Sequence, residues 1–482
     1  MKKKFITNLA ILLFLNLLIK PFWIFGIDRT VQNVLGEVEY GFYFSLFNFS
    51  LLLNIALDIG ITNFNNKNIA QYNQLLSKYL SNIVVLKIFL ALVYFAISIL
   101  VAFFIGYEWK QFKLLFFLLF NQFLLSFILY LRSNISGLHL FKIDSLVSVL
   151  DRTLMIIICS FLLWGNVTKG EFKIEWFVYA QTSAYLITFI ITFLIVLSKS
   201  EFLIFKINLK YFIIILKQCY PYALLVLLMA FYYRIDSVML ERLLPNGKEQ
   251  AGIYAQAFRI LDAFSMFAFL FAVLLLPMFS KMIKHKEPIE QLTKFSFLLL
   301  IIPAITLSMA CIFYRVDIIN LLYKGNIEAS PSIFGILMLC FILISVSYIF
   351  GTLLTANGNL KELNIMAVTS VLVNILLNLI LIPKFFAFGA AIASLITQAF
   401  AALVQVFIAK KVFRFKVNYN LLFLLISFIT GILLIGFLLK KIIYSWHYSF
   451  LIMLISGIIL AFVIKLIKLK VLYQIIKYGD EG

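Results

Sequence analysis

The chain consists largely of long apolar runs separated by short polar segments. Three representative runs, at residues 88–104, 114–131 and 421–439, are nearly continuous. The wall of a membrane β-barrel would instead alternate apolar and polar residues with a period of two. Because lipid offers no hydrogen-bond partner to a free backbone amide, apolar runs of this length in a bilayer form helices. The pattern therefore predicts membrane-spanning α-helices.

A spanning helix needs about 20 predominantly apolar residues. By this measure the chain is predicted to be an all-α integral membrane protein with about 14 transmembrane helices. The expected spans are residues 5–26, 42–62, 82–105, 114–137, 144–164, 176–197, 218–243, 252–280, 295–314, 330–355, 363–383, 387–409, 419–439 and 446–466. No connection between them is long enough to hold an enzymatic domain.

The composition agrees with a membrane protein. Of the 482 residues, 64% are hydrophobic and 13% are charged, whereas soluble domains average about 45–50% and about 25%. The cysteines and histidines are scattered and lack the spacing of metal ligands, so we expect no metal site and no cofactor. These residues are Cys159, Cys219, Cys311, Cys340, His139, His285 and His447.

The formal net charge of +20 would also suit a nucleic-acid-binding protein, so the positions of the cations decide between the two interpretations. The cations are concentrated in alternate loops, as the positive-inside rule predicts for the cytoplasmic side of a membrane protein. We therefore expect a multi-pass protein of the inner (plasma) membrane with both termini cytoplasmic, and no nucleic-acid partner. No cleavable signal is expected, because Lys2, Lys3 and Lys4 precede a run of spanning length.

A short motif occurs once in each half of the chain. Residues 39–43 (EYGFY) match residues 250–254 (QAGIY), and a glycine followed by a lysine comes after the fourth predicted helix of each half. Transporters are often built from duplicated bundles. With an even number of helices per half, both copies would have the same orientation in the membrane. Chance is the alternative explanation for matches this short.

Several segments, in their order and spacing, resemble the polysaccharide flippases, the Wzx-like branch of the multidrug/oligosaccharidyl-lipid/polysaccharide (MOP) exporter superfamily. The resemblance covers essentially the whole chain, although no single motif in it is very specific. The segments are residues 35–43 (LGEVEYGFY), 58–60 (DIG), 234–240 (RIDSVML), 251–260 (AGIYAQAFRI), 276–277 (LP) and 356–361 (ANGNLK), with Asn374 and Asn378.

The resemblance implies two pseudo-symmetric six-helix lobes around a central cavity, at residues 1–205 and 206–415, followed by two additional helices and a cytoplasmic tail at 416–482. It also implies alternating access for undecaprenyl-diphosphate-linked oligosaccharide units, carried from the cytoplasmic to the outer leaflet for O-antigen, capsule or exopolysaccharide synthesis. The implied partners are this lipid-linked substrate, membrane lipid and the polysaccharide polymerase machinery.

Charges inside predicted spans are costly, so each is a candidate for function. Arg234 and Asp236 lie in the seventh span and, being two residues apart, cannot share a helix face. At least one of them therefore needs a partner on another helix or in a cavity. Asp236 is also a candidate for coupling transport to an ion.

Arg259 lies in the eighth span. Asp262 follows three residues later, close enough on a helix to pair with it. An arginine in a cavity suits a diphosphate, because its planar donor fork binds phosphate oxygens in two places and stays charged. The alternative is that Arg259 and Asp262 form a structural ion pair within the lobe. Asp262 is the second candidate for ion coupling.

The first span contains Lys20, and depth in the membrane predicts that this side chain snorkels far or faces the interior. Pro21 and Gly26 would let the same helix bend and serve as a gating hinge, because proline removes a backbone hydrogen bond. Arg29 lies near the outer end, where a solvated interfacial charge and a cation lining the cavity are equally good interpretations.

Other charges near span ends are predicted to be structural, and Lys87 and Arg132 to anchor their helices at the cytoplasmic interface. The structural set is Asp58, Asp151, Arg152, Glu241 and Arg242.

The cations inside the spans favour a lipid-linked oligosaccharide flippase, since an anionic head group has to cross a region of low dielectric constant. The alternative is a multidrug, cation-coupled efflux transporter on the same scaffold, which Asp236 and Asp262 keep open. A membrane enzyme such as a polymerase or ligase would be expected to have a sizeable outer loop. We therefore predict a transporter and no catalytic residues.

Overall fold

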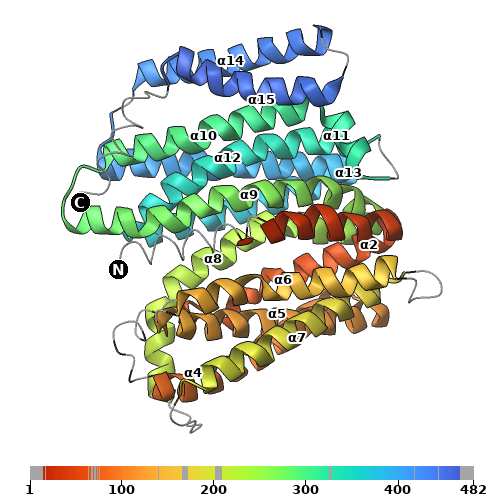
Figure 1. The fold of residues 1–482 in the computed structure, drawn as a ribbon, viewed down its shortest axis with the longest axis vertical. Coiled ribbons are helices and arrows are strands. Elements are labelled where there is room, and N and C mark those ends of the chain that lie inside the picture. The colour runs from red at the N-terminus through yellow and green to blue at the C-terminus, as the bar shows by residue number, and fades with distance from the viewer. Residues whose placement is uncertain are drawn as a thin grey trace. The chain divides into compact units, whose positions relative to one another are not determined.

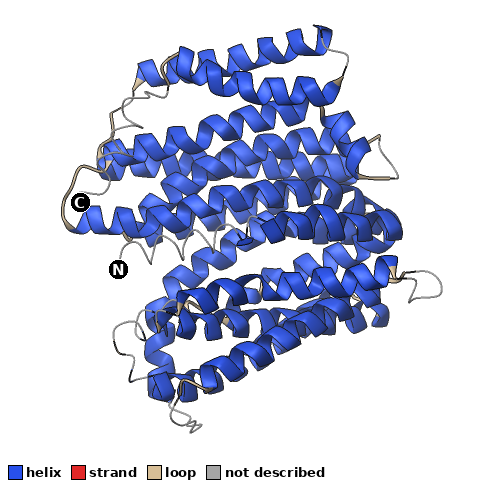
Figure 2. Cartoon of the chain, in the orientation of Figure 1, coloured by secondary structure: helices blue, strands red, loops and turns tan. Residues whose placement is uncertain are grey.

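The computed structural model describes residues 15–16, 18–62, 65–66, 69, 72, 74, 76–138, 140–165, 172–200, 209–324, 328–416, 418–442 and 445–466. These residues form helices joined by turns and loops, and no strand occurs among them (Figure 2). The chain divides into two compact units, which we call the N-terminal unit (Met1–Ala255) and the C-terminal unit (Gln256–Gly482). The predicted lobe boundaries at 205 and 415 stay predictions.

The N-terminal unit ends inside a long helix, α9, that continues past the unit boundary (Figure 1). Helix α2 packs against α5 and α8, and α7 packs against α5 and α6. The elements are η1 (Trp23–Asp28), α2 (Arg29–Leu52), η2 (Asn54–Leu57), α4 (Leu76–Ile105), α5 (Trp109–Gly137), α6 (Phe141–Trp164), α7 (Ile174–Leu197), α8 (Leu209–Leu243) and α9 (Gly247–Lys284).

In the C-terminal unit, α12 packs against α10 and α13, while α14 and α15 form a pair that lies against α10 (Figure 1). The core between α10, α14 and α15 is apolar and includes Ile305, Phe428 and Met453. The remaining elements are α10 (Glu290–Phe313), α11 (Arg315–Leu322), α12 (Ser330–Ala356), α13 (Leu360–Phe413), α14 (Tyr419–Ile442) and α15 (Trp446–Val463).

Two of these helices contain a break. Gly36 in α2 has φ 74° and ψ 176°, a backbone conformation that glycine adopts at little cost. Phe386 in α13 has φ 53° and is likewise non-helical, three residues after Pro383. Each break separates two helices that otherwise run on from one another, so α13 consists of two segments, 360–385 and 387–413.

The predicted class is confirmed: the chain is a multi-pass all-α membrane protein. Among the described residues, 11 helices are long and apolar enough to cross a bilayer, the 54-residue α13 being one of them. Large apolar side chains face outward from these helices. The side chain of Phe104, for example, is 83% exposed. An apolar surface of this extent is one that a bilayer covers. The count of fourteen spans and the two symmetric lobes stay predictions.

The two copies of the repeated motif lie against each other within the N-terminal unit. A Cβ atom added to Gly41 on α2 would clash with the backbone oxygen of Lys248, and one added to Gly252 on α9 would clash with the backbone of Glu37. Small residues let membrane helices approach this closely. The glycine of each copy is therefore required by the contact between α2 and the start of α9.

Candidate functional site

Two cations and two aromatic rings meet where η1 faces α6 and α7. The guanidinium of Arg152 lies 5.5 Å from the ring centroid of Trp23 and 5.8 Å from that of Tyr185. Lys20, one helical turn before Trp23, interacts electrostatically with Arg152 and with Asp151. Nε of Arg152 is 3.6 Å from a carboxylate oxygen of Asp151. We call these five residues the Lys20–Arg152 cluster.

The cluster carries two positive charges against the single negative charge of Asp151, so its local charge is positive. The Arg152 side chain is 25% exposed and Lys20 is half-buried, which leaves both cations accessible to a ligand. Trp23 stacks on Phe177, with ring centroids 5.7 Å apart and planes 3° from parallel. That contact fixes the aromatic wall beneath the guanidinium. The arrangement suits an anionic group.

Arg29 opens α2 and is half-buried. Its Nε atom is buried and has no hydrogen-bond partner in the part of the chain that the structure describes. A buried donor without a partner costs free energy. A ligand that binds beside Arg29 would supply the missing acceptor.

Arg234 on α8 donates a hydrogen bond of 2.9 Å from Nη1 to the side-chain oxygen of Asn48 on α2. Its guanidinium also lies 5.3 Å from the ring centroid of Tyr233. Asp236, two residues on, is fully buried and accepts a hydrogen bond of 3.0 Å from the hydroxyl of Tyr254. Both residues thus have partners on other helices, whereas their spacing in the sequence requires this of at least one.

A second buried aspartate–tyrosine pair lies near the start of the chain. Asp28 is 3% exposed and accepts a hydrogen bond of 2.8 Å from the hydroxyl of Tyr40. The two pairs are alike: an aspartate buried in one helix is bound by the tyrosine of the next. Sequence reasoning missed Asp28 because the first predicted span ended at residue 26. In the structure the helix runs through η1 and continues to the break at Gly36.

The predicted hinge in the first helix falls on irregular backbone. η1 is a π-helix, and the N–H of Arg29 that follows it bonds to the carbonyl of Ile24, five residues back. Pro21 lies just before this segment and Gly26 lies inside it. Single π turns interrupt helices at functional sites more often than elsewhere. A role for Pro21 and Gly26 in gating stays a prediction.

Arg259 and Asp262 lie on α9 within the C-terminal unit. Both are half-buried, and both have interaction partners. The structure therefore brings Lys20 together with Arg152, a residue that the sequence assigned to a structural role. The roles predicted for Lys20, Arg234 and Arg259 in substrate binding stay predictions.

A surface hollow of about 450 Å³ lies among α4, α5 and α7, outside this cluster. Its lining is aromatic and aliphatic apart from Lys113, and includes Trp109, Phe116 and Tyr179. Substrate sites combine apolar walls with several convergent polar groups. A single exposed lysine does not meet that description, so we place the candidate site at the Lys20–Arg152 cluster, with Arg29 as a further candidate cation on the helix that continues from η1.

Comparison with solved structures shows which known fold the chain shares. The chain is similar to the lipid II flippase MurJ in an inward closed conformation, with TM-score 0.68, 16% identity and coverage of 98% of this chain and 99% of that one. It is also similar to an inward-facing multidrug resistance MATE family transporter of the MOP superfamily, with TM-score 0.61, 15% identity and coverage of 82% and 94%. At such low identities the likeness shows the fold alone, and both proteins share it with this chain.

A further similar structure is a MOP superfamily transporter from Pyrococcus furiosus, with TM-score 0.57, 15% identity and coverage of 84% and 93%. A comparison with curated proteins found no relative that matches. The model of the polysaccharide biosynthesis protein family matches residues 7–283, more than half of the chain. The chain belongs to this family.

Proposed function

We propose that this protein is a flippase that moves undecaprenyl-diphosphate-linked oligosaccharide units from the cytoplasmic to the outer leaflet by alternating access, in the synthesis of O-antigen, capsule or exopolysaccharide. The observation that carries the proposal is the positive Lys20–Arg152 cluster inside the helical bundle. Membership of the polysaccharide biosynthesis family and the likeness in fold to a lipid II flippase support it.

The chemistry of the substrate matches the cluster. A diphosphate presents several charged oxygens, and guanidinium binds such oxygens through two parallel hydrogen bonds. The anion leaves water during transport, which is costly unless fixed cations replace its hydration. In this proposal Lys20, Arg29 and Arg152 supply that replacement in the N-terminal unit, while Arg234 and Arg259 line the path elsewhere.

The rings of Trp23 and Tyr185 are buried, with 8% and 5% of their surface exposed. In the proposal they hold the guanidinium of Arg152 through cation–π contacts beside the site for the diphosphate. In this proposal the protein lies in the inner membrane with both termini cytoplasmic, and it works beside the polysaccharide polymerase machinery.

A second candidate function is cation-coupled multidrug efflux. The buried carboxylates of Asp28 and Asp236 favour it, as does the likeness in fold to MATE transporters. Buried carboxylates bind protons or metal cations and attract cationic drugs. In the flippase, Asp236 and Asp262 are the residues that we propose for coupling to a proton or sodium gradient.

Transport by the purified protein in proteoliposomes distinguishes the two functions. A fluorescent undecaprenyl-diphosphate oligosaccharide becomes accessible on the opposite leaflet if the protein is a flippase, and Arg152→Ala slows this step. A lipophilic cationic dye tests efflux in the same vesicles. Movement of the dye without movement of the lipid-linked sugar would overturn the flippase proposal.

A further inference from the structure

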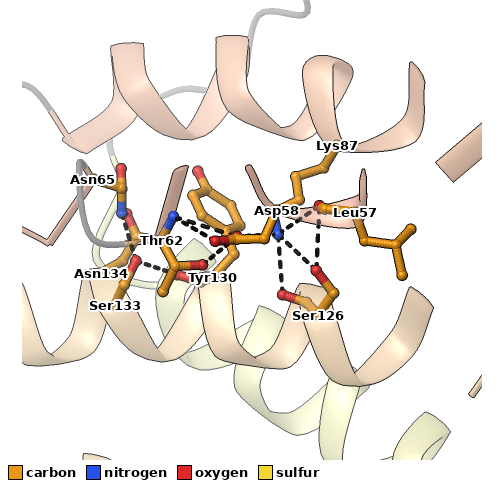
Figure 3. A network of polar contacts seen from close by, with 9 residues as sticks. All are labelled: Leu57, Asp58, Thr62, Asn65, Lys87, Ser126, Tyr130, Ser133 and Asn134. Atoms are coloured by element: carbon orange, nitrogen blue, oxygen red, sulfur yellow. Dashed lines mark hydrogen bonds and ion pairs between the residues drawn. The ribbon is translucent and has the colours of Figure 1, made fainter. Parts of the chain in front are cut away.

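A lysine of the N-terminal unit, Lys87, lies among polar side chains inside the protein (Figure 3). Lys87 on α4 is 2% exposed, so the prediction that it anchors its helix at the cytoplasmic interface was wrong. The side chain turns inward because oxygen atoms surround its end. It forms an ion pair of 2.7 Å with Oδ1 of Asp58.

Four oxygen atoms from two segments of the chain form a cage around the Lys87 ammonium (Figure 3). Besides Asp58 Oδ1, they are the carbonyl oxygen of Leu57 at 3.1 Å, the carbonyl oxygen of Ser126 at 3.2 Å and the hydroxyl oxygen of Ser126 at 2.8 Å. An ammonium has three N–H donors and no acceptor. The cage therefore satisfies every donor of the buried cation, and the charge of Asp58 cancels its charge.

The cage exists because the backbone leaves helical geometry after η2. Ile59 has φ 46° and Gly60 has φ 84°, and the carbonyl oxygen of Leu57 accepts hydrogen bonds from Lys87 and from the Ser126 hydroxyl. The carboxylate of Asp58 is held in turn by the hydroxyl and backbone N–H of Thr62. Side chains of α4 and α5 thus satisfy backbone groups that a continuous helix would have paired internally.

Helix α5 contributes a continuous polar face to this region (Figure 3). Ser126, Tyr130, Ser133 and Asn134 follow the spacing of one helix face. The amide of Asn65 donates hydrogen bonds of 2.8 Å to Ser133 and 3.0 Å to Asn134. The same face that supplies the Ser126 oxygens therefore also fixes the segment after Asp58. Such a preorganised set of oxygens is a built site for a cation.

We propose that this cage is a site for a small monovalent cation, and that the ammonium of Lys87 is its permanently tethered occupant. All four ligands are oxygens, they lie 2.7 to 3.2 Å from the nitrogen, and one carboxylate balances one positive charge. A divalent ion would leave an excess charge in the protein interior. The expected ligands are ammonium and primary alkylammonium ions, because their N–H groups donate hydrogen bonds to these oxygens.

The proposal does not depend on what the protein transports. In the native protein the Lys87 ammonium is the counter-ion of Asp58, so the cage needs no exchangeable ion. The Asp58 side chain is 26% exposed, so a free cation would have a route into the cage once the lysine stem is removed.

Chemical rescue of Lys87→Ala tests the proposal. In this variant of the purified full-length protein, the midpoint of thermal unfolding falls by about 6 °C or more, because the half-buried carboxylate of Asp58 loses its counter-ion. At equal ionic strength, n-propylammonium chloride restores at least half of the loss. Ammonium chloride restores less, since it fills less of the space left by the stem. Tetramethylammonium chloride, which has no N–H donor, restores none.

Two variants serve as matched controls. Lys87→Met fills the space with an uncharged stem of similar length, so its midpoint is lowered but does not respond to n-propylammonium. Lys113→Ala removes an exposed lysine of α5 and keeps the wild-type midpoint in every salt. Equal responses of Lys87→Ala to n-propylammonium and to tetramethylammonium would overturn the proposal.

A second comparison applies if Lys87→Ala does not fold. Asp58→Asn leaves the ammonium without its carboxylate, whereas Asp58→Asn with Lys87→Met leaves a neutral cage. The double variant is expected to unfold at a higher temperature than Asp58→Asn alone. A double variant that is equally or less stable would show that the oxygens do not require charge balance, and would overturn the proposal.

Discussion

The Lys20–Arg152 cluster and the Lys87 cage place buried or half-buried cations in the same unit with opposite chemistry. In the cluster, two cations face one carboxylate and both remain accessible. In the cage, one cation meets one carboxylate and three further oxygens, and the lysine is 2% exposed. A cation in a membrane helix is therefore not by itself a sign of a binding site. A surplus of positive charge marks a candidate site for an anionic ligand, whereas charge balance and satisfied donors mark a fixed structural element.

The largest expected effect concerns the cage. Lys87→Met should lower the free energy of unfolding by about 3–5 kcal/mol, because it leaves Asp58 as an uncompensated charge. Denaturation of the purified protein measures this loss. Transport per folded molecule should stay close to wild type. A stable variant that is defective in transport would move Lys87 into the functional class and break the comparison.

The next effect concerns the cations proposed to line the path. Arg234→Ala and Arg259→Ala should abolish glycan export while the protein remains in the membrane. Surface glycan is measured by gel or lectin staining, and membrane content by immunoblot. Asn48→Ala is the control for Arg234, since it removes the 2.9 Å hydrogen bond but keeps the cation. Wild-type surface glycan in both arginine variants would contradict the role of these residues.

Arg152 tests the cluster more finely. Arg152→Ala should slow movement of the lipid-linked substrate by about 10- to 100-fold, the usual worth of a charged hydrogen bond. Arg152→Lys keeps the charge but loses the planar fork, so about tenfold is expected. Proteoliposome flipping rates measure both. Equal rates for lysine and alanine would mean that the geometry of the fork matters and charge does not, while a wild-type rate for Arg152→Ala would remove the cluster from the site.

The smallest effect is expected for the carboxylates proposed for coupling. Asp236→Asn keeps an acceptor for the Tyr254 hydroxyl, which is 3.0 Å away in the native protein, so folding should change little. Export should lose its dependence on a proton or sodium gradient while substrate binding persists. Rates in vesicles with and without an imposed gradient measure this. A wild-type rate that ignores both gradients would rule out coupling altogether.

Much of the fold could be predicted from the sequence, because long apolar runs have few alternatives in a bilayer. The site was predicted less completely. Lys87 was assigned to the interface because a pattern does not show which way a long side chain turns; only the oxygens of Leu57 and Ser126 decide that. Arg152 was assigned to structure because nothing in the spacing connects it with Lys20, more than 100 residues earlier. Asp28 was not predicted as a candidate because the first predicted span ended at residue 26, before the helix ends.

The π-helix at Trp23–Asp28 also determines where side chains point. An α-helix turns by about 100° per residue, and a π turn holds one more residue than an α turn for each hydrogen bond. Residues after η1 are therefore rotated about the helix axis relative to those before it. A regular helical wheel assigns Lys20 and Arg29 to the wrong relative directions. If the π turn moved one residue toward the C-terminus, Arg29 would rotate about the helix axis while Lys20 kept its direction. The chain would not have to break for this change.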